Sequence, residues 1–469
     1  MQVTKRQQEE TNTIAAISTP FGTSGIGIVR MSGPEAFEIA ARVFRSKKAF
    51  NKIGSHTVTH GKIVDPVDNR MLDDVLLIKM AGPRTFTAED VVEINCHGGI
   101  TVLKNILALL LRQGARAAGP GEFTKRAFIN GRMDLAQAEA VIDLINARTD
   151  EGSRAAAAQL EGRLSERIRG ARSKLISLIA HIEAVVEYPE YDIEEVTGES
   201  VNEGVQKVRK ELLKITEGYE RGRLIREGIT AAIIGKPNAG KSSLLNVLSG
   251  SSRAIVTDIP GTTRDVIEEY INVRGIPVRF LDTAGIRNTD DPVEFIGVER
   301  AKKAALEAEL VIVVLDAQTG LLQDDMDIIL STKGQKRIIL INKTDIANDH
   351  EIAEMKRRLC QNEDSPIVVA SMNDGTGMEK LLKTIEDLFL DGVINTNNEV
   401  LLTNVRHKQL LENAAGSLEN AITAYRDGLP LDFVTIDIKE SADYLGQITG
   451  ESVSEDVVNE IFSRFCIGK

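Results

Sequence analysis

The stretch from Ile229 to Ser242 constrains the fold of this 469-residue chain more than any other feature. Ile229 to Ile234 is a short apolar run rich in β-branched residues, which is typical of a buried parallel strand. It continues into the pattern G-x4-G-K-S and then into an apolar segment of helical character. Glycines let the backbone direct its N–H groups at phosphate oxygens, and the start of a helix attracts anions. The stretch therefore predicts a phosphate-binding loop between a strand and a helix.

Inside this loop, Lys241 would place a positive charge at the β- and γ-phosphates, and Ser242 would offer a hydroxyl to Mg2+. Apolar strands alternate with helices from here to about Leu390, which predicts a doubly wound α/β domain. The expected strands are Ile229–Ile234, Glu268–Val273, Val278–Leu281, Leu310–Leu315, Arg337–Ile341 and Pro366–Ala370.

Two further motifs are suited to the phosphates and the metal. Gly261-Thr-Thr-Arg-Asp265 would place Thr263 over Mg2+. Asp282-Thr-Ala-Gly285 ends a strand, so that Asp282 could hold Mg2+ through water and the Gly285 N–H could meet the γ-phosphate.

Two more motifs are suited to a guanine base. Asp345 of Asn342-Lys-Thr-Asp345 can accept both guanine donors that adenine lacks, and Lys343 could lay its alkyl stem over the base. Asn342 would tie this loop to the phosphate loop, and Ser371 would complete base recognition. Met372 stands where GTPases usually have Ala. Each motif alone could be an ordinary strand-end turn, but five in order on alternating strands predict a GTP site.

The rest of the chain divides into two compositions. Residues 13–134 mix short strands with a helix, which indicates an α+β domain; the expected elements are strands Ile14–Ser18, Gly25–Arg30, His56–Val64, Asp74–Met80 and Asp90–Cys96 and helix Ile100–Arg112. Residues 135–226 are rich in helix formers, with one long helix expected over Val201–Ile225. Helices are expected again over Asn398–Arg426 and Glu455–Phe465. We therefore expect a multidomain α/β and α+β protein: an N-terminal domain (1–134), a helical domain (135–227 with 391–469), and an inserted domain (228–390).

Composition narrows the possible partners. The net charge is −12, aromatic residues make up 4% and Trp is absent, so a general nucleic-acid coat or a stacking single-strand binder is excluded. Any nucleic acid must bind locally, weakly or through a partner. The series Arg163, Arg167, Arg169, Arg172 and Lys174 could be such a patch, although interleaved Glu161 and Glu166 favour a solvated helix face.

Three cysteines, Cys96, Cys360 and Cys466, provide no disulfide framework, and no apolar run is long enough for a membrane span. We therefore expect a cytoplasmic protein. Cys96-His97 alone lacks the spacing of a metal site, so a structural role at a strand end is favoured for His97.

Motifs outside the inserted domain give the chain a close likeness to a known family. They are Gly25–Arg30, Phe86–Asp90, Cys96–Gly99, Pro120–Asn130, Asp134–Glu139 and Phe465–Lys469. Together with the nucleotide motifs, this set resembles the tRNA modification GTPase family (MnmE/TrmE) over essentially the whole chain.

The resemblance implies how GTP would be hydrolysed. Ile286 occupies the place of the usual water-orienting Gln, and the family uses a potassium ion and face-to-face pairing of two such domains instead. It implies K+ ligands at Asn238, Thr257, Ile259 and Thr262, Mg2+ ligands at Ser242 and Thr263, and Glu294 as the catalytic residue. Arg264 and Arg287 are lesser alternatives for charge stabilisation. The full nucleotide-binding set would be Asn238, Ala239, Gly240, Lys241, Ser242, Ser243, Thr257, Asp258, Ile259, Pro260, Gly261, Thr262, Thr263, Asp282, Thr283, Ala284, Gly285, Asn342, Lys343, Asp345 and Ser371.

The resemblance also implies the modification chemistry. The N-terminal domain would bind tetrahydrofolate through Arg30, Glu93, Arg132 and Lys469, and would dimerise. The one-carbon unit would come from 5,10-methylenetetrahydrofolate, with 5-formyltetrahydrofolate as an analogue. Cys466 is required for modification in the family, and a catalytic role as nucleophile or general acid/base is a hypothesis. Without the resemblance it would be a small apolar residue beside Phe465. With an FAD-dependent MnmG/GidA-type partner, as a heterotetramer, the homodimer would modify C5 of the tRNA wobble uridine to carboxymethylaminomethyluridine.

Two alternative functions remain. A regulatory GTPase, such as a ribosome-assembly switch, would share the nucleotide motifs. A folate-dependent methyltransferase acting alone would share the N-terminal motifs but would work without GTP.

Overall fold

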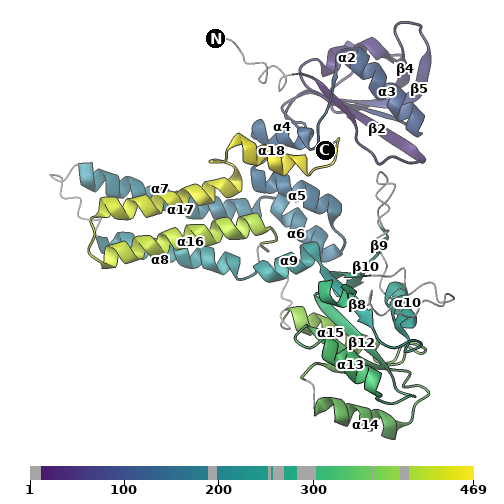
Figure 1. The fold of residues 1–469 in the computed structure, drawn as a ribbon. Helices are drawn as coiled ribbons and strands as arrows, with labels where there is room; N and C mark the ends of the chain where they lie inside the picture. The colour runs from purple at the N-terminus through teal and green to yellow at the C-terminus, as the bar shows by residue number, and fades with distance from the viewer. Residues whose placement is uncertain are drawn as a thin grey trace.

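A computed structural model describes residues 12–187, 198–251, 255–256, 269–281, 303–361, 364–390 and 401–468. Figure 1 shows an N-terminal sheet, a bundle of long helices and a second sheet with its own helices. Each has a separate hydrophobic core, which confirms the expected fold class.

The N-terminal sheet has strand order β3-β4-β5-β6-β2-β1-β7. Helices α2 and α3 cover one face, where Ile39, Leu103 and Ile106 are fully buried. The elements are β1 (Ile14–Ile17), β2 (Ser24–Ser32), α2 (Ala36–Val43), β3 (Phe44–Arg45), the short helix η1 (Phe50–Lys52), β4 (Thr57–Val64), β5 (Met71–Met80), β6 (Val91–Gly98), α3 (Ile100–Arg112), β7 (Arg116–Ala117) and α4 (Glu122–Ile129). The expected strands and helix are all present; α2, α4, β3 and β7 were not predicted.

The other face of this sheet is covered unevenly. At the β1 end, Phe123 of α4 packs on Ile14 and Ala16. Toward β4 and β5, Val58 is 60% exposed and Leu76 is 47% exposed. This face therefore carries an exposed apolar area beside a covered one.

The helical bundle is built from both sides of the insertion. Its core joins residues of α7 and α8 to residues of α16 and α17, such as Leu175, Leu212, Leu418 and Ile438. The split helical domain is therefore confirmed. Its helices are α5 (Leu135–Asn146), α6 (Asp150–Leu160), α7 (Arg163–Glu187), α8 (Gly198–Thr216), α9 (Tyr219–Glu227), α16 (Val405–Arg426), α17 (Leu431–Thr449) and α18 (Glu455–Ser463).

Two helix predictions need correction, and one helix was missed. The helix expected over Val201–Ile225 is two helices, because the chain breaks between α8 and α9 near Gly218. The helix expected from Asn398 begins at Val405, where the Asn404 side chain caps it. Helix α17 was missed, because exposed Phe433 and Ile436 obscure its helical apolar period.

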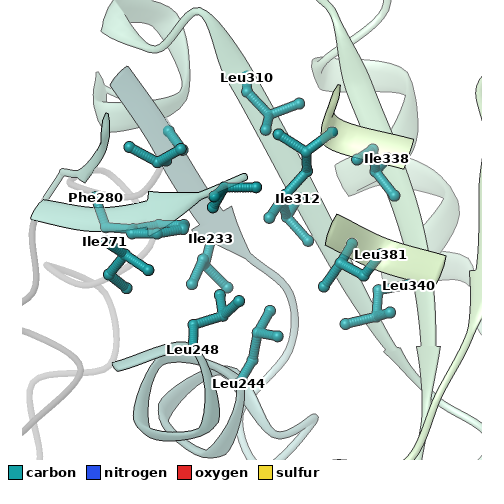
Figure 2. Close-up of a cluster of buried hydrophobic side chains, with 14 of the residues drawn as sticks. Ile233, Leu244, Leu248, Ile271, Phe280, Leu310, Ile312, Ile338, Leu340 and Leu381 are labelled. Carbon is teal, nitrogen blue, oxygen red and sulfur yellow. The ribbon is translucent and has the colours of Figure 1, made fainter. Parts of the chain in front are cut away.

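The inserted unit is a sheet of order β14-β13-β12-β8-β11-β10-β9, with parallel pairing from β11 to β14 and an antiparallel edge. Figure 2 shows Leu244 and Leu248 of α10 beneath Ile233 of β8, with Leu381 of α15 beside Leu340. The elements are β8 (Ile229–Ile234), α10 (Lys241–Ser251), β9 (Ile255–Val256), β10 (Glu269–Val273), β11 (Ile276–Phe280), β12 (Leu310–Asp316), α13 (Gln323–Ser331), β13 (Arg337–Asn342), α14 (Asp349–Cys360), β14 (Ile367–Val369) and α15 (Met378–Leu390).

The arginine series on α7 mostly faces carboxylates of other segments. Arg169 contacts Asp134 at 2.5 Å, Arg172 contacts Glu451 at 2.6 Å, and Lys174 contacts Glu211 at 2.7 Å. These three pairs tie α7 to its neighbours, while Arg163 pairs with Glu161 and Arg163, Arg167, Arg169 and Lys174 are exposed, which agrees with the favoured solvated face.

A buried polar cluster joins the chain before the insertion to the chain after it. Glu139 of α5 accepts hydrogen bonds from Arg406 Nη2 at 2.7 Å and from Asn404 Nδ2 at 3.0 Å, and its Oε2 lies 2.7 Å from His407 Nε2. Burial alone would raise the pKa of Glu139, but His407 and Arg406 hold it at about 2. The charged carboxylate therefore fixes how α16 sits against α5.

We predict that Glu139→Gln lowers the free energy of unfolding at pH 7 by about 3 kcal/mol, because it leaves the Arg406 guanidinium without its carboxylate partner in a largely buried cluster. The pKa of Glu139 is lowered from 4.5 to about 2, so its stabilisation is fully present above pH 4.5 and is lost as pH falls toward 2. The difference in free energy of unfolding between wild type and Glu139→Gln should therefore become smaller as pH falls from 4.5 toward 2.

The measurement is urea unfolding followed by circular dichroism. Glu161→Gln, at a carboxylate 64% exposed, is the matched control and should change little. Equal stability of Glu139→Gln and wild type at pH 7 would contradict the role given to this cluster.

Candidate functional site: a phosphate loop and a base clamp

The loop between β8 and α10 has the backbone shape that its glycines require. Gly235 and Gly240 have φ of +149° and +103°, and Asn238 has φ 62°. A Cβ on Gly240 would lie 2.1 Å from Asn342 Nδ2, so only glycine fits there. The residues present therefore form a cradle that a phosphate chain fits, as the sequence predicts.

Lys241 lies at the centre of this loop. Its ammonium donates to the Gly235 carbonyl at 2.8 Å and to the Lys236 carbonyl at 2.7 Å, and burial lowers its pKa. Lys236 of the same loop pairs with the buried carboxylate of Asp325 on α13 at 2.8 Å, and this ion pair anchors the loop to α13. The cation expected to meet phosphate is thus held inside the loop.

Asn342 connects the phosphate loop to the base side of the site. Its Nδ2 donates to the Ala239 carbonyl at 2.9 Å, and its Oδ1 accepts from the Met372 N–H at 3.1 Å. The predicted tie between the two loops is confirmed. Met372 itself is buried in the core of this unit, so its side chain replaces the usual Ala without entering the site.

The Asp345 carboxylate is held at both oxygens. Ser371 Oγ donates to Oδ1 at 2.9 Å, and Asn373 Nδ2 donates to Oδ2 at 3.1 Å. Lys343, at φ 63°, extends its ammonium to Asp316 Oδ2 at 2.6 Å. These contacts fix the Asp345 carboxylate through the loop after β14 and hold the Lys343 side chain against the end of β12.

Sequence reasoning missed Asn373, Asp316 and Asp325. A signal existed for Asp316, because it ends β12 directly opposite Asn342 in the parallel register, and strand ends on one sheet edge lie together. Nothing in the sequence pattern indicates the partners of Asn373 or Asp325.

Part of the predicted nucleotide site lies outside the described residues. This holds for the proposed metal, switch and catalytic positions; they are Thr257, Asp258, Ile259, Pro260, Gly261, Thr262, Thr263, Arg264, Asp282, Thr283, Ala284, Gly285, Arg287 and Glu294. Of the metal-ligand candidates, Asn238 and Ser242 are described, and both belong to the phosphate-loop region.

A second candidate site lies on the N-terminal sheet. Arg30 Nε donates to Glu93 Oε1 at 2.7 Å, and its guanidinium lies 5.8 Å from the Phe86 ring and 5.7 Å from the Phe123 ring. Arg132 also faces Phe86, at 6.0 Å. Arg30 and Arg132 therefore lie at one ring, Phe86, which begins one of the motifs quoted above, and Arg30 holds Glu93.

The C-terminal tail reaches this same unit, as Figure 1 shows near α4. Ile467 bridges Pro120, the Cys466 carbonyl accepts from the Gly121 N–H at 3.3 Å, and the Gly468 carbonyl accepts from Ser18 Oγ at 3.1 Å. Cys466 is exposed, as expected. Lys469 lies outside the described residues.

The other candidate groups have structural contacts. His97 Nδ1 lies 2.7 Å from Asp73 Oδ1, and the described residues hold no cluster of potential metal ligands. Burial, and then Asp73, raise the pKa of the Cys96 thiol to about 11, so it stays protonated. Among the described residues, no helix has both the length and the apolar character to cross a bilayer.

The doubly wound sheet, the glycine-shaped loop and the clamped Asp345 define a P-loop protein of the GTPase class. Comparisons with known proteins agree. The family description "MnmE helical domain" matches residues 135–466, and "GTP-binding protein TrmE N-terminus" matches residues 13–132. The tRNA modification GTPase MnmE of Acetivibrio thermocellus is 59% identical over 98% of this chain and 99% of its own length. The chain belongs to the MnmE family of tRNA modification GTPases.

A second relative and a solved structure are also similar to this chain. The MnmE protein of Enterococcus faecalis is 48% identical over 98% of this chain and 99% of its own length. Among solved structures, Aquifex aeolicus Era bound to GDP·AlF4− is 26% identical, covering 40% of this chain and 66% of its own, with a TM-score of 0.28.

We predict that Asp345→Asn weakens GDP binding at least tenfold and raises the affinity for xanthosine diphosphate, because an amide can donate where xanthine carries a carbonyl. Competition against a fluorescent GDP analogue measures both. Asp349→Asn, at an exposed carboxylate on α14, is the control. A variant that keeps the wild-type preference for guanine would show that Asp345 does not read the base.

Proposed function

We propose that this protein is a potassium-activated GTPase that modifies the wobble uridine of certain tRNAs, working as a homodimer with an FAD-dependent MnmG-type partner. The observation that carries the GTPase part is the Asn342 link, which holds the phosphate loop and the base clamp as one pocket. We assign the units as 1–134, 135–227 with 391–469, and 228–390.

The chain's own residues would divide the work on GTP. Lys241 would neutralise the phosphates, Ser242 and Thr263 would hold Mg2+, and Asp345 would select guanine. Mg2+ would supply charge neutralisation at the β- and γ-phosphate oxygens. Glu294 would orient the attacking water, since Ile286 cannot.

Potassium would take the place of an arginine finger. Asn238 would present a side-chain oxygen to K+, with Thr257, Ile259 and Thr262 as further ligands. Asn238 has a left-handed φ of 62°, a conformation that Asn adopts readily, so its place in the phosphate loop and not its backbone supports this role.

The N-terminal cluster would bind a tetrahydrofolate. Arg30, Arg132 and Lys469 suit its carboxylate tail, Glu93 suits the donor edge of a pterin, and Phe86 offers a ring face. The one-carbon donor would be 5,10-methylenetetrahydrofolate. Cys466 would lie nearby, because its carbonyl accepts a hydrogen bond from the Gly121 N–H.

Homodimerisation is supported by the exposed apolar area on this sheet. Ile26 is 65% exposed, and Val58 and Leu76 are exposed on neighbouring strands of the same unit. A second copy would bury them.

The test is mass analysis of tRNA nucleosides from a strain that lacks the chain, complemented with wild type or with Lys241→Ala. Carboxymethylaminomethyluridine should vanish on deletion and return only with wild type. Unchanged wobble uridines would favour the regulatory alternative, and full modification by Lys241→Ala would favour a methyltransferase that works without GTP.

We predict that Asn238→Gly abolishes the stimulation of GTP turnover by K+ over Na+ while GDP affinity changes less than threefold. Glycine removes the proposed ligand without straining the left-handed backbone. Asn69→Gly, at an exposed Asn with φ 55°, is the matched control. K+ stimulation that survives in Asn238→Gly would remove Asn238 from the potassium site.

A further inference from the structure

One surface of the N-terminal unit is strongly basic although the chain as a whole is acidic. Between residues 39 and 64 there is no Asp or Glu, while Lys and Arg occur repeatedly, in a chain of net charge −12. We call this set the β3-edge basic patch; its members are Arg42, Arg45, Lys47, Lys48, Lys52 and Lys62. All are exposed.

The fold brings these cations together at one edge of the sheet. Strand β3 is the edge strand, α2 leads into it and η1 follows it. Arg45 of β3 lies directly opposite Lys62 of β4 in the antiparallel register. Like charges at directly opposed positions destabilise a strand pair. The patch is therefore a local concentration of positive charge and not only a run in the sequence.

Protein carboxylates neutralise little of this charge. Arg42 contacts Glu38 at 3.7 Å, and Asp74, which lies opposite Lys62, is engaged by His60 at 3.1 Å. Within the part of the chain that the structure describes, Arg45 donates to the Ala41 and Phe44 carbonyls and pairs with no carboxylate. Among the described residues, Lys47, Lys48 and Lys52 form no ion pair with a carboxylate.

A simpler role for such residues is protection of a sheet edge, where lysines discourage pairing with another chain. A two-residue edge strand needs few charges for that purpose. The excess of positive charge continues through Lys47 and Lys48 after β3 and Lys52 in η1, and these residues are not in an edge strand.

We propose that the β3-edge basic patch binds the phosphate backbone of the tRNA substrate, an inference that rests on the proposed function. Phosphate contacts are made by clustered Lys and Arg on an otherwise solvated surface. A protein partner is disfavoured, because protein interfaces are depleted in Lys and enriched in aromatic residues. The patch holds no aromatic side chain beyond half-buried Phe50.

The position of the patch suits such a substrate. By strand register, Arg45 and Lys62 lie on the same face of the sheet as Arg30 and Glu93. Strand β3 is four strand spacings from β2, or about 19 Å. The basic patch at the edge and the candidate folate site therefore face the same side of the N-terminal sheet, and a polynucleotide longer than this separation could contact both.

The test is fluorescence anisotropy of labelled tRNA with the full-length chain and the double variant K47E/K48E. We expect the variant to lose affinity by about tenfold or more, and the dependence of log affinity on log salt concentration to become shallower by about two. tRNAs with and without the target uridine should lose affinity equally, because backbone contacts carry no sequence information.

The control is K210E/K214E on α8, which changes the net charge equally at exposed lysines. Unchanged tRNA affinity in K47E/K48E, or an equal loss in the control, would overturn the proposal. The proposal would also be overturned if K47E/K48E bound anionic vesicles or polyglutamate more weakly than wild type while it bound tRNA equally well. If wobble modification depends on the chain while K47E/K48E binds tRNA normally, only the patch assignment fails and the proposed function stands.

Discussion

The side chain of Asn342 is the interaction on which the nucleotide site depends. It donates to the phosphate loop at Ala239 and accepts from the base side at Met372, so two loops from different strands cannot move independently. The same amide lies where a Cβ on Gly240 would be, which links the glycine pattern to the base motif by a steric constraint. One buried side chain thus links the phosphate loop to the loop after β14.

A second set of interactions connects the nucleotide-binding unit and the C-terminal tail to the helical bundle. The chain leaves the helical bundle at α9 and returns at α16, and the charged Glu139 cluster joins the two sides. Arg406 also donates to the Gln447 carbonyl at the end of α17, from which the chain continues to α18 and the C-terminal tail. At the other side, Arg148 lies 3.4 Å from the Tyr270 ring centroid, so the inserted unit contacts the bundle directly. The nucleotide unit and the tail that carries Cys466 are therefore attached to one framework.

The fold and part of the site could be predicted from sequence because their signals are local. The phosphate loop, the motifs that follow β13 and β14 and helix α3 depend on residue types at fixed spacing, and the structure has them where they were expected. The strand-end motif Asp282–Gly285 lies outside the described residues and stays a prediction. Helix α17 could not be predicted, because apolar residues on its exposed side conceal the period. The clamp on Asp345 by Asn373 and the aromatic surround of Arg30 depend on side chains distant in sequence, which no spacing rule brings together.

The central claim is that the segments 235–240, 342–345 and 371–373 form one guanine-nucleotide pocket. Hydrogen exchange of the full-length chain, followed by mass spectrometry with and without nucleotide, tests it most directly. The account predicts that GDP slows amide exchange in all three segments together, while ADP at the same concentration leaves them unchanged. Equal protection by ADP, or protection of the phosphate loop alone, would contradict it.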